Sequence, residues 1–262
     1  MTAIGLDIGS LTTKVVVMDG EGVLSQLVVP SGDDTEAVAR SAVRSALEKA
    51  GVTDEGAPVV VTGVGAKSQS LSAQQKAMTT CLARGARYLM PTVRMVIDIG
   101  AESSTVIKLN ERGRLVDWAN HDKCAAGTGL FLQAMAKLMQ VPIEEFAKLS
   151  LGAKGRADIS GTCAVFAESE VISHVHRVPP TPKPDIVAGI YFATVSRLLA
   201  LCKRIGIEKE MAVVGGVALN TGLVKVLEGE LGFKVIVPAN PQTVAALGAA
   251  IIARESLETG RK

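Results

Sequence analysis

The chain arranges its hydrophobic and polar residues in one pattern that occurs twice. An apolar run over residues 3–10 contains Asp7-Ile8-Gly9, and a second run over residues 95–101 contains Asp98-Ile99-Gly100. Each run is followed by a hydroxyl-rich turn, a β-branched run, a polar turn signal and a further apolar segment. Strand, glycine turn, strand, turn, strand is the pattern of a β-meander. The sequence therefore predicts two meanders built on one plan.

Helical and strand patterns alternate outside the meanders. The first half continues with a helix over 35–50, a strand over 59–63 and a mainly helical segment over 68–89. The second half predicts helices over 129–140, 163–173, 185–203 and 243–254, strands over 211–214 and 234–237, and a stiff proline-rich loop over 179–184. Asp185 is the expected N-cap of the helix that follows this loop. The alternation predicts an α/β protein with mixed sheets flanked by helices.

Composition and charge narrow the function classes. The net charge is +2 and no segment is densely basic, so nothing indicates nucleic acid as a partner. The first strand begins within three residues of the start, which leaves no room for a signal peptide. No apolar run reaches the roughly 18–20 residues of a spanning helix, and 244–253 is the nearest. Four cysteines without a secretory signal indicate a reducing cytoplasm. We expect a cytoplasmic protein with no membrane partner.

The two Asp-Ile-Gly turns have the composition of phosphate-binding turns. Glycine lets backbone N–H groups approach phosphate oxygens closely. Hydroxyls and an ammonium group that could contact phosphate follow the first turn, at Ser10, Thr12, Thr13 and Lys14. Two acids beside a polyanion, Asp7 and Asp98, make sense if a hydrated Mg²⁺ lies between carboxylate and phosphate. The alternatives are ordinary hairpin turns and an exposed lysine on a strand.

The chain contains three further glycine-bearing segments that could approach a nucleotide or a neighbouring helix closely. The turn that starts at Gly215-Gly216 and reaches Asn220 follows a strand and suits the close approach of a base or ribose. Gly248 suits tight packing of the last helix against a hinge partner, and simple helix–strand packing is the alternative for both. Residues 63–68 invite a P-loop interpretation, which fails because Ala66 stands where a glycine must precede the lysine.

Together, the two Asp-Ile-Gly turns and the Gly-Gly turn resemble those of the actin, hexokinase and sugar-kinase ATPase superfamily. The resemblance implies two ribonuclease-H-like domains with ATP in the cleft between them. We expect the first domain over residues 1–91, with the C-terminal helix over 243–258 packing back on it. The second is expected over residues 92–242.

Two of the four cysteines stand where metal ligation is favoured. Cys124 lies in a glycine-bearing turn just before a helix, and Cys163 lies at the start of another. The partial positive charge at a helix N-terminus stabilises a thiolate. Two thiolates do not complete a four-ligand site, but a two-fold dimer would present four to one cluster.

Plainer interpretations of the cysteines stay open. Cys124 and Cys163 could be small buried hydrophobes, which is the interpretation we favour for Cys81 and Cys202 on apolar helix faces. A zinc site is a further alternative, with His121, His174 or His176 supplying nitrogen ligands.

The segments around both cysteines narrow the resemblance. Residues 123–129 read KCAAGTG and residues 163–173 read CAVFAESEVIS. These motifs resemble the signature segments of the 2-hydroxyacyl-CoA dehydratase activators, which belong with the ATPase subunits of benzoyl-CoA reductase. The resemblance covers essentially the whole chain. The resemblance implies a homodimer, or a heterodimer with a related subunit, that shares one [4Fe–4S] cluster through Cys124 and Cys163 of each chain. It also implies a CoA-ester dehydratase or reductase as partner and a ferredoxin or flavodoxin as electron donor.

Site roles follow from this resemblance. The expected catalytic residues are Asp7, Asp98 and Glu102, and the expected ATP contacts are Gly9, Ser10, Thr12, Thr13, Lys14, Gly100, Ala101, Gly215, Gly216 and Asn220. Many activators carry Gly-Gly-Gln-Asp where this chain has Gly100-Ala101-Glu102-Ser103. A carboxylate in place of the amide must contact Mg²⁺ or water, and this variant looks closer to the benzoyl-CoA reductase subunits.

Two other functions remain as alternatives. A small-molecule kinase of the same superfamily would need a catalytic base, which Asp98 or Asp122 could supply. It gives no reason for two cysteines at helix starts. A nucleotide-sensing module without turnover is the second alternative.

Overall fold

The computed structural model describes residues 2–53, 56–68, 73–121 and 128–259. The chain divides into two compact units. The first comprises residues 1–94, 109–116 and 238–262, and the second comprises residues 95–108 and 117–237. Both predicted meanders are confirmed, as is the α/β class with mixed sheets.

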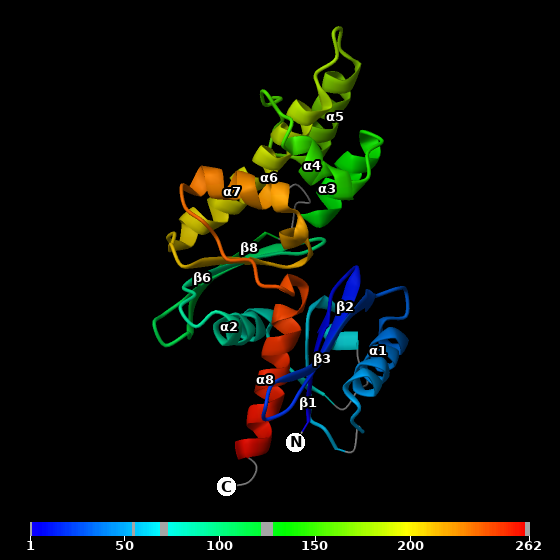
Figure 1. Ribbon diagram of the computed structural model, residues 1–262, viewed down its shortest axis with the longest axis vertical. Helices are drawn as coiled ribbons and strands as arrows, with labels where there is room; N and C mark the ends of the chain where they lie inside the picture. The colour runs from blue at the N-terminus through cyan, green and yellow to red at the C-terminus, as the bar shows by residue number, and fades with distance from the viewer. Residues whose placement is uncertain (1, 54–55, 69–72, 122–127, 260–262) are drawn as a thin grey trace. The chain divides into compact units, whose positions relative to one another are not determined.

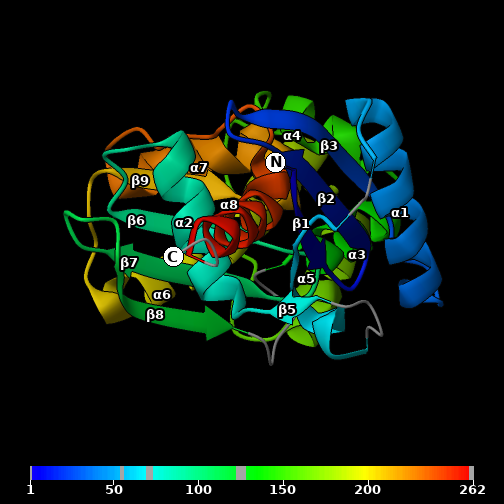
Figure 2. The same ribbon diagram turned by 90° about the horizontal axis from the view of Figure 1, so that it is seen from below.

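The described part of the first unit holds a five-stranded sheet in the order β3-β2-β1-β4-β5. Its strands are β1 (Ala3–Ile8), β2 (Thr12–Met18), β3 (Val23–Pro30), β4 (Val59–Thr62) and β5 (Gln74–Gln75). The meander strands β1 to β3 pair antiparallel, whereas β1 pairs with β4 in parallel. Helices α1 (Thr35–Ala50) and α8 (Val244–Thr259) lie on opposite sides of this sheet (Figure 2).

Alternation along β1 explains this layering. Ile4, Leu6 and Ile8 pack in one core with Ala39 and Val43 of α1. Ala3 is part of a separate core with Ala246 and Ala250 of α8. Side chains of a strand point alternately to its two faces, so a strand apolar at nearly every position is covered on both.

The last helix packs closely on α2 (Met78–Leu89). A methyl group on Gly248 would lie 1.7 Å from the carbonyl oxygen of Cys81, and one on Gly85 would lie 1.9 Å from that of Val244. Glycine at these two positions lets the backbones of α2 and α8 approach each other. Tight packing at Gly248 is therefore observed, and the helix that it contacts is α2.

The second unit is built on a four-stranded sheet, within the described ranges, in the order β8-β7-β6-β9. Its strands are β6 (Met95–Ile99), β7 (Ser104–Leu109), β8 (Leu115–His121) and β9 (Met211–Val214). Five helices gather on one side of this sheet (Figure 1), namely α3 (Gly129–Leu138), α4 (Ile143–Ser150), α5 (Ala164–His176), α6 (Lys183–Ile205) and α7 (Thr221–Leu231). They share one core with Met95, Ile97 and Ile99 of β6.

Helix α6 corrects two predictions. It begins at Lys183, with Pro182 as N-cap and Pro184 in its first turn. Proline is tolerated there because the backbone N–H groups of the first turn have no acceptor within the helix. Asp185 is therefore not the N-cap, and its carboxylate accepts hydrogen bonds from the backbone N–H groups of Lys154 and Gly155. Its 23 residues are also long and apolar enough to span a membrane, which the sequence prediction had denied for every segment. Most of its apolar stretch is buried inside the unit, as in the core helix of a soluble protein.

Other element predictions were wrong in part. Helices α4 and α7 were not predicted, and the helix expected over 68–89 begins only at Met78, after the 3₁₀ turn Val64–Ser68 and β5. The strand expected over 234–237 is reduced to a single bridge between Ile236 and Ala212.

Candidate functional site

The first Asp-Ile-Gly turn joins β1 to β2 and places an acid beside a base. Asp7 lies opposite Lys14 across the strand pair. The Lys14 Nζ is 3.1 Å from Asp7 Oδ2, and both side chains are largely buried. The backbone N–H of Gly9 donates to the carbonyl of Thr12 at 3.0 Å and closes the turn. The positive charge beside the turn therefore comes from its own hairpin.

Two hydroxyl groups stabilise this turn through hydrogen bonds. Thr13 is fully buried, and its Oγ1 is 3.0 Å from Ser31 Oγ. The Ser31 hydroxyl donates in turn to the carbonyl of Gly9 at 2.7 Å. The buried Thr13 hydroxyl thus belongs to a chain that holds the turn, whereas Ser10 and Thr12 are partly exposed.

The second Asp-Ile-Gly turn, between β6 and β7, is held differently. The Gly100 N–H donates to the carbonyl of Ser103 at 2.9 Å, as in the first turn. The carbonyls of Gly100 and Ala101 then accept hydrogen bonds, at 2.9 Å each, from Gly129 and Leu130 in the first turn of α3. Glu102 is exposed at the tip. The second turn is therefore bonded directly to the start of a helix.

Each aspartate faces a glycine at the end of the neighbouring parallel strand. A methyl group on Gly63, after β4, would lie 2.6 Å from Asp7 Oδ1. One on Gly215, after β9, would lie 2.5 Å from Asp98 Oδ1. Both glycines have positive φ angles, +92° and +86°, which a side chain rarely adopts. Two independent constraints therefore require glycine at both positions.

The role of Gly63 was missed in the sequence prediction, which considered this residue as the end of a strand and as part of a P-loop. The available signal was the parallel between VVVTG at 59–63 and AVVGG at 212–216, each an apolar strand followed by glycine. The repeat thus extends to the fourth strand of each unit.

The third predicted turn lies between β9 and α7. Gly216 is exposed, while Asn220 is the N-cap of α7. The Asn220 Oδ1 accepts hydrogen bonds from the Leu223 N–H at 3.1 Å and from the Tyr191 hydroxyl at 2.8 Å. Because the oxygen is engaged twice, the amide Nδ2 is the group that remains to donate to a ligand. Burial raises the pKa of the Tyr191 phenol, which keeps it a donor.

Cys163 is the N-cap of the 13-residue helix α5 and is partly exposed. Its side chain makes no capping hydrogen bond. The two residues before it, Gly161 and Thr162, are held through their carbonyls by the guanidinium of Arg197 on α6. The same guanidinium contacts His121 Nε2 at 3.0 Å.

His121 is the last residue of β8, three positions before Cys124. Arg197 therefore joins the segments that precede both candidate cysteines. No sequence signal pointed to it.

The remaining candidates fall into three groups. Cys124 and Asp122 lie outside the described residues. Cys81 and Cys202 are fully buried, and burial raises the pKa of their thiols to about 11 and about 12, which confirms their prediction as core residues. His174 is bonded to Thr181 and to the Asp158 carbonyl. Among the residues that the structure describes, no three His, Cys, Asp or Glu side chains gather as metal ligands.

Comparison with known proteins adds a family and close relatives. The model of the BadF/BadG/BcrA/BcrD ATPase family matches residues 4–253. A 2-hydroxyisocaproyl-CoA dehydratase activator of Clostridioides difficile is 40% identical over 100% of this chain and 98% of its own. The (R)-2-hydroxyglutaryl-CoA dehydratase activating ATPase of Acidaminococcus fermentans is 39% identical, over 95% of this chain and 96% of its own.

A benzoyl-CoA reductase subunit of Thauera aromatica is more distant. It is 33% identical over 85% of this chain and 80% of its own. Both activators are therefore more similar to this chain than the reductase subunit is, which is the opposite of the direction that the Glu102 variant had suggested.

Solved structures agree with the fold. The activator of the 2-hydroxyisocaproyl-CoA dehydratase from Clostridium difficile, solved with bound ADPNP, superimposes with a TM-score of 0.92 at 40% identity, covering 100% of this chain and 97% of that one. A ROK hexokinase from Thermus thermophilus superimposes with a TM-score of 0.53 at 15% identity over 98% of this chain and 100% of its own, which shows the fold alone.

Proposed function

The chain belongs to the BadF/BadG/BcrA/BcrD ATPase family, and on that premise we propose that it uses ATP hydrolysis to drive one-electron transfer into a partner enzyme. The partner would be a 2-hydroxyacyl-CoA dehydratase, because the activators are similar to this chain over nearly its full length. An ATPase subunit of a benzoyl-CoA reductase is the second candidate, supported by the similarity to the Thauera aromatica reductase subunit. The single observation that carries the proposal is Cys163 at the start of α5, in a segment that Arg197 joins to the residues before Cys124.

We assign the nucleotide to the turns described above. Ser10, Thr12 and the backbone N–H of Ala101 would contact phosphates, with Lys14 adding positive charge. Gly9 and Gly100, whose N–H groups close the turns, would let the phosphates come close to the backbone. Thr13, whose hydroxyl is bonded to Ser31, would act by holding the first turn. Gly215, Gly216 and the Nδ2 of Asn220 would contact the nucleoside. Asp7 and Asp98 would hold a hydrated Mg²⁺, which neutralises phosphate charge. Glu102, exposed at its tip, would orient the attacking water.

Cys163, the proposed ligand that the structure describes, is compatible with a shared [4Fe–4S] cluster. The residue is partly exposed at a helix N-terminus, and its side chain makes no capping hydrogen bond. With Cys124, one chain supplies two thiolates, so four ligands require two chains around a two-fold axis. The partner chain would be a second copy or a related ATPase subunit.

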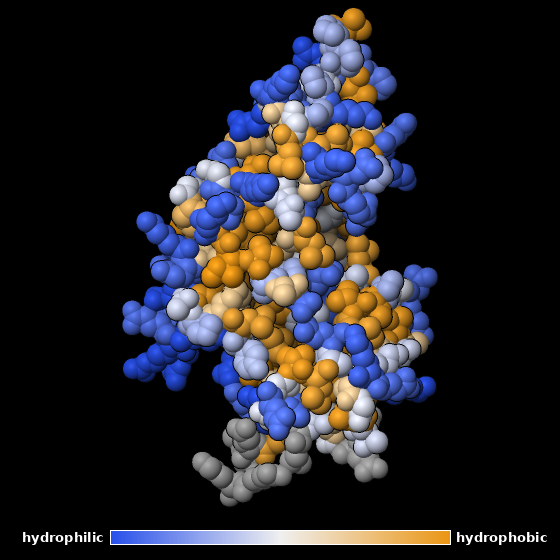
Figure 3. Space-filling model, viewed as in Figure 1, coloured by the Kyte–Doolittle hydropathy of each residue, from blue (hydrophilic) through white to orange (hydrophobic). Residues whose placement is uncertain are grey.

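Exposed apolar side chains support such an association. Val165 and Phe166, next to Cys163 in the first turn of α5, are 65% and 62% exposed. Figure 3 shows that hydrophobic side chains reach the surface among hydrophilic ones on the face that it displays. Exposed large apolar residues grouped at one place are typical of contact surfaces.

The second turn gives ATP a route to the cysteine segment. Gly100 and Ala101 would follow the phosphates, and their carbonyls are bonded to Gly129 and Leu130 of α3. A shift of this turn on hydrolysis would therefore move the start of α3, which directly follows residues 122–127. When bound, the cluster would supply a one-electron carrier of low potential. Each 100 mV of deficit corresponds to about 2.3 kcal/mol per electron, which is why the transfer needs ATP. A cytoplasmic ferredoxin or flavodoxin would be the electron donor.

The test is iron and sulfide analysis of protein purified without oxygen. The wild type should be brown, with about four irons per dimer. Cys124→Ser and Cys163→Ser should each lose the iron and keep ADPNP binding, because neither residue lies in the nucleotide turns. Cys202→Ala is the matched control, since this thiol is fully buried in the core of the second unit.

Two results would contradict the proposal. Iron-free protein, or iron retained by both serine variants, would exclude the shared cluster. A colourless protein that phosphorylates a small acid with ATP would support the kinase alternative instead.

A further inference from the structure

A second candidate binding site lies in the first unit, among residues unrelated to the nucleotide turns. A pocket of about 490 Å³ is formed by α2, α8 and the turn between β7 and β8. Its charged lining consists of five arginines and one glutamate, namely Arg84, Arg87, Arg112, Arg114, Arg254 and Glu255. Three segments far apart in the sequence therefore contribute positive charge to one concave place.

Little of this charge is neutralised. Glu255 is paired with Arg84. Arg87 donates from Nη2 to the carbonyl of Glu111 at 3.2 Å, which is a neutral acceptor. Within the described ranges, no carboxylate lies at ion-pair distance from Arg87, Arg112, Arg114 or Arg254. With five arginines and one glutamate, the lining carries a net charge of +4 (5 − 1), a local excess that a soluble domain usually disperses over its surface.

Arg254 is anchored in the wall of the pocket. Its Nε is buried and has no hydrogen-bond partner among the described residues. One of its terminal nitrogens, Nη1, donates to the carbonyl of Asp19 at 3.4 Å. An anion in the pocket would therefore be bound by the terminal nitrogens of Arg254 and not by its Nε, which has no accessible surface.

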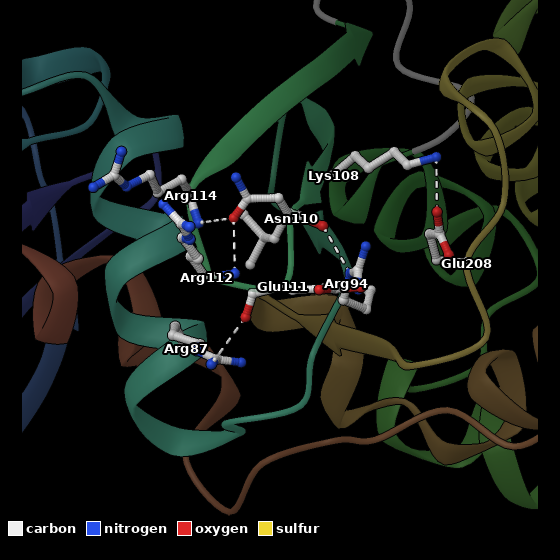
Figure 4. Close-up of polar contacts among 9 residues, drawn as sticks. Arg87, Arg94, Lys108, Asn110, Glu111, Arg112, Arg114 and Glu208 are labelled. Carbon is white, nitrogen blue, oxygen red and sulfur yellow. Dashed lines mark hydrogen bonds and ion pairs between the residues drawn. The ribbon is translucent and has the colours of Figure 1, made fainter.

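The turn that carries Arg112 and Arg114 has a fixed backbone. Asn110 Oδ1 accepts hydrogen bonds from the backbone N–H groups of Arg112 and Arg114, at 3.0 Å each (Figure 4). Gly113 has a φ of +71°, and a methyl group on it would lie 2.7 Å from Cγ and Cδ of Arg87. The turn is thus fixed against the stem of an arginine from α2, which sets the backbone positions of Arg112 and Arg114 beside the pocket.

We propose that this pocket binds a small anion that carries two or more phosphate groups. Guanidinium groups bind phosphate through paired, parallel hydrogen bonds, and several phosphates can engage several arginines at once. The volume lies in the range of small-molecule sites. An acidic peptide would need an extended groove, whereas three segments close around this pocket. The inference does not depend on the proposed electron transfer.

Inorganic pyrophosphate is the probe for this proposal. Calorimetric titration should be done with saturating ADPNP and Mg²⁺, so that the nucleotide turns are already occupied. We expect one pyrophosphate per chain, with an affinity that falls as salt is raised. Arg112→Gln and Arg114→Gln should each weaken binding by about ten- to a hundredfold, since each removes a charged hydrogen-bond donor. ADPNP affinity should not change in either variant.

Arg40→Gln is the matched control, because Arg40 is an exposed arginine of the same unit that pairs with Glu36 on α1. It should leave pyrophosphate binding unchanged. Absence of pyrophosphate binding, or equal affinity in the Arg112→Gln/Arg114→Gln double variant, would overturn the proposal. Tighter binding of a hexaglutamate peptide than of pyrophosphate would overturn the assignment to phosphate.

Discussion

The two Asp-Ile-Gly turns share a backbone plan but differ in what surrounds it. In the first, Asp7 faces Lys14 across the hairpin, and the turn is supported by the hydroxyls of Thr13 and Ser31. In the second, the residue opposite Asp98 is Thr105, which brings no charge. That turn is bonded to the backbone of α3 instead. The duplicated hairpins therefore differ in their contacts. The first pairs its aspartate with a lysine of the same hairpin, and the second is hydrogen-bonded to the start of a helix.

This difference assigns separate tasks to the two units. A turn closed on its own hairpin is suited to holding phosphate in a constant geometry. A turn whose carbonyls accept from Gly129 and Leu130 passes any displacement to α3. If both turns contact nucleotide, we expect the second to report whether ATP or ADP is bound.

The strongest test of the comparison is the pair of glycines that face the aspartates. Gly63→Ala and Gly215→Ala should each lower the free energy of unfolding by about 1–3 kcal/mol, because both residues have positive φ and almost no space for a methyl group. Both variants should also bind ADPNP poorly, since the aspartate beside each glycine must move. Urea unfolding and calorimetry measure the two effects.

Gly229→Ala is the control for these variants, because no atom would crowd its methyl group and it lies within helix α7. It should stabilise the protein by about 0.5–1 kcal/mol. Unchanged stability in Gly63→Ala, with a loss in Gly215→Ala, would show that the two units are not equivalent at this position.

A substitution of Arg197 tests how the second unit holds the segments that precede the cysteines. Arg197→Lys keeps the charge but removes the fork that holds Gly161, Thr162 and His121. We expect a loss of about 1.5–3 kcal/mol in stability and a lower iron content, with ADPNP affinity unchanged. Arg204→Gln, an exposed site on the same helix, should change neither quantity. Full iron content in Arg197→Lys would limit Arg197 to a structural role.

Lys14→Thr makes the first turn resemble the second. Removing the ammonium group should weaken ADPNP binding by about tenfold, as expected for the loss of one charged contact to phosphate. Adding Asp7→Asn would relieve the unpaired Asp7 without restoring affinity. Recovery of affinity in the double variant would mean that Lys14 serves only to neutralise Asp7.

Because the thiols of Cys81 and Cys202 are buried, we expect the free energy of unfolding to depend on pH in the alkaline range. Burial raises the pKa of Cys81 to about 11 and that of Cys202 to about 12, from a usual value of 9.0. The unfolded chain therefore loses these protons first as the pH rises above 9. The free energy of unfolding should fall by about 1 kcal/mol per thiol and pH unit until the folded pKa is reached. Urea unfolding at pH 8.5 and 10.5 measures this.

Cys202→Ala should remove the contribution of one thiol to the pH dependence of the free energy of unfolding. This holds whether or not the substitution changes stability at neutral pH. An identical dependence in the wild type and this variant would contradict the assignment to Cys202.

The second unit shows where sequence patterns stop being sufficient. Strand β6 begins where its predicted apolar run begins, at Met95, and ends two residues before the run does, because the run and the turn after it are local signals. Helix α6 was started two residues late, since Asp185 looked like a cap and prolines looked like loop. The carboxylate instead binds the backbone of residues 154–155, a contact 30 residues away that no local rule contains.

The sequence alone determined the two meanders, the glycine turns with their acids, and Cys163 at the start of a helix. Each depends on residues close together in the chain, where the period of apolar positions and the chemistry of turns act directly. Only the tertiary structure decided which residue faces which acid, how the second turn is bonded to α3, that Arg197 joins the cysteine segments, and that five arginines share one pocket. These pairings join residues that lie far apart in the chain, and packing of the strands and helices sets the distances between them.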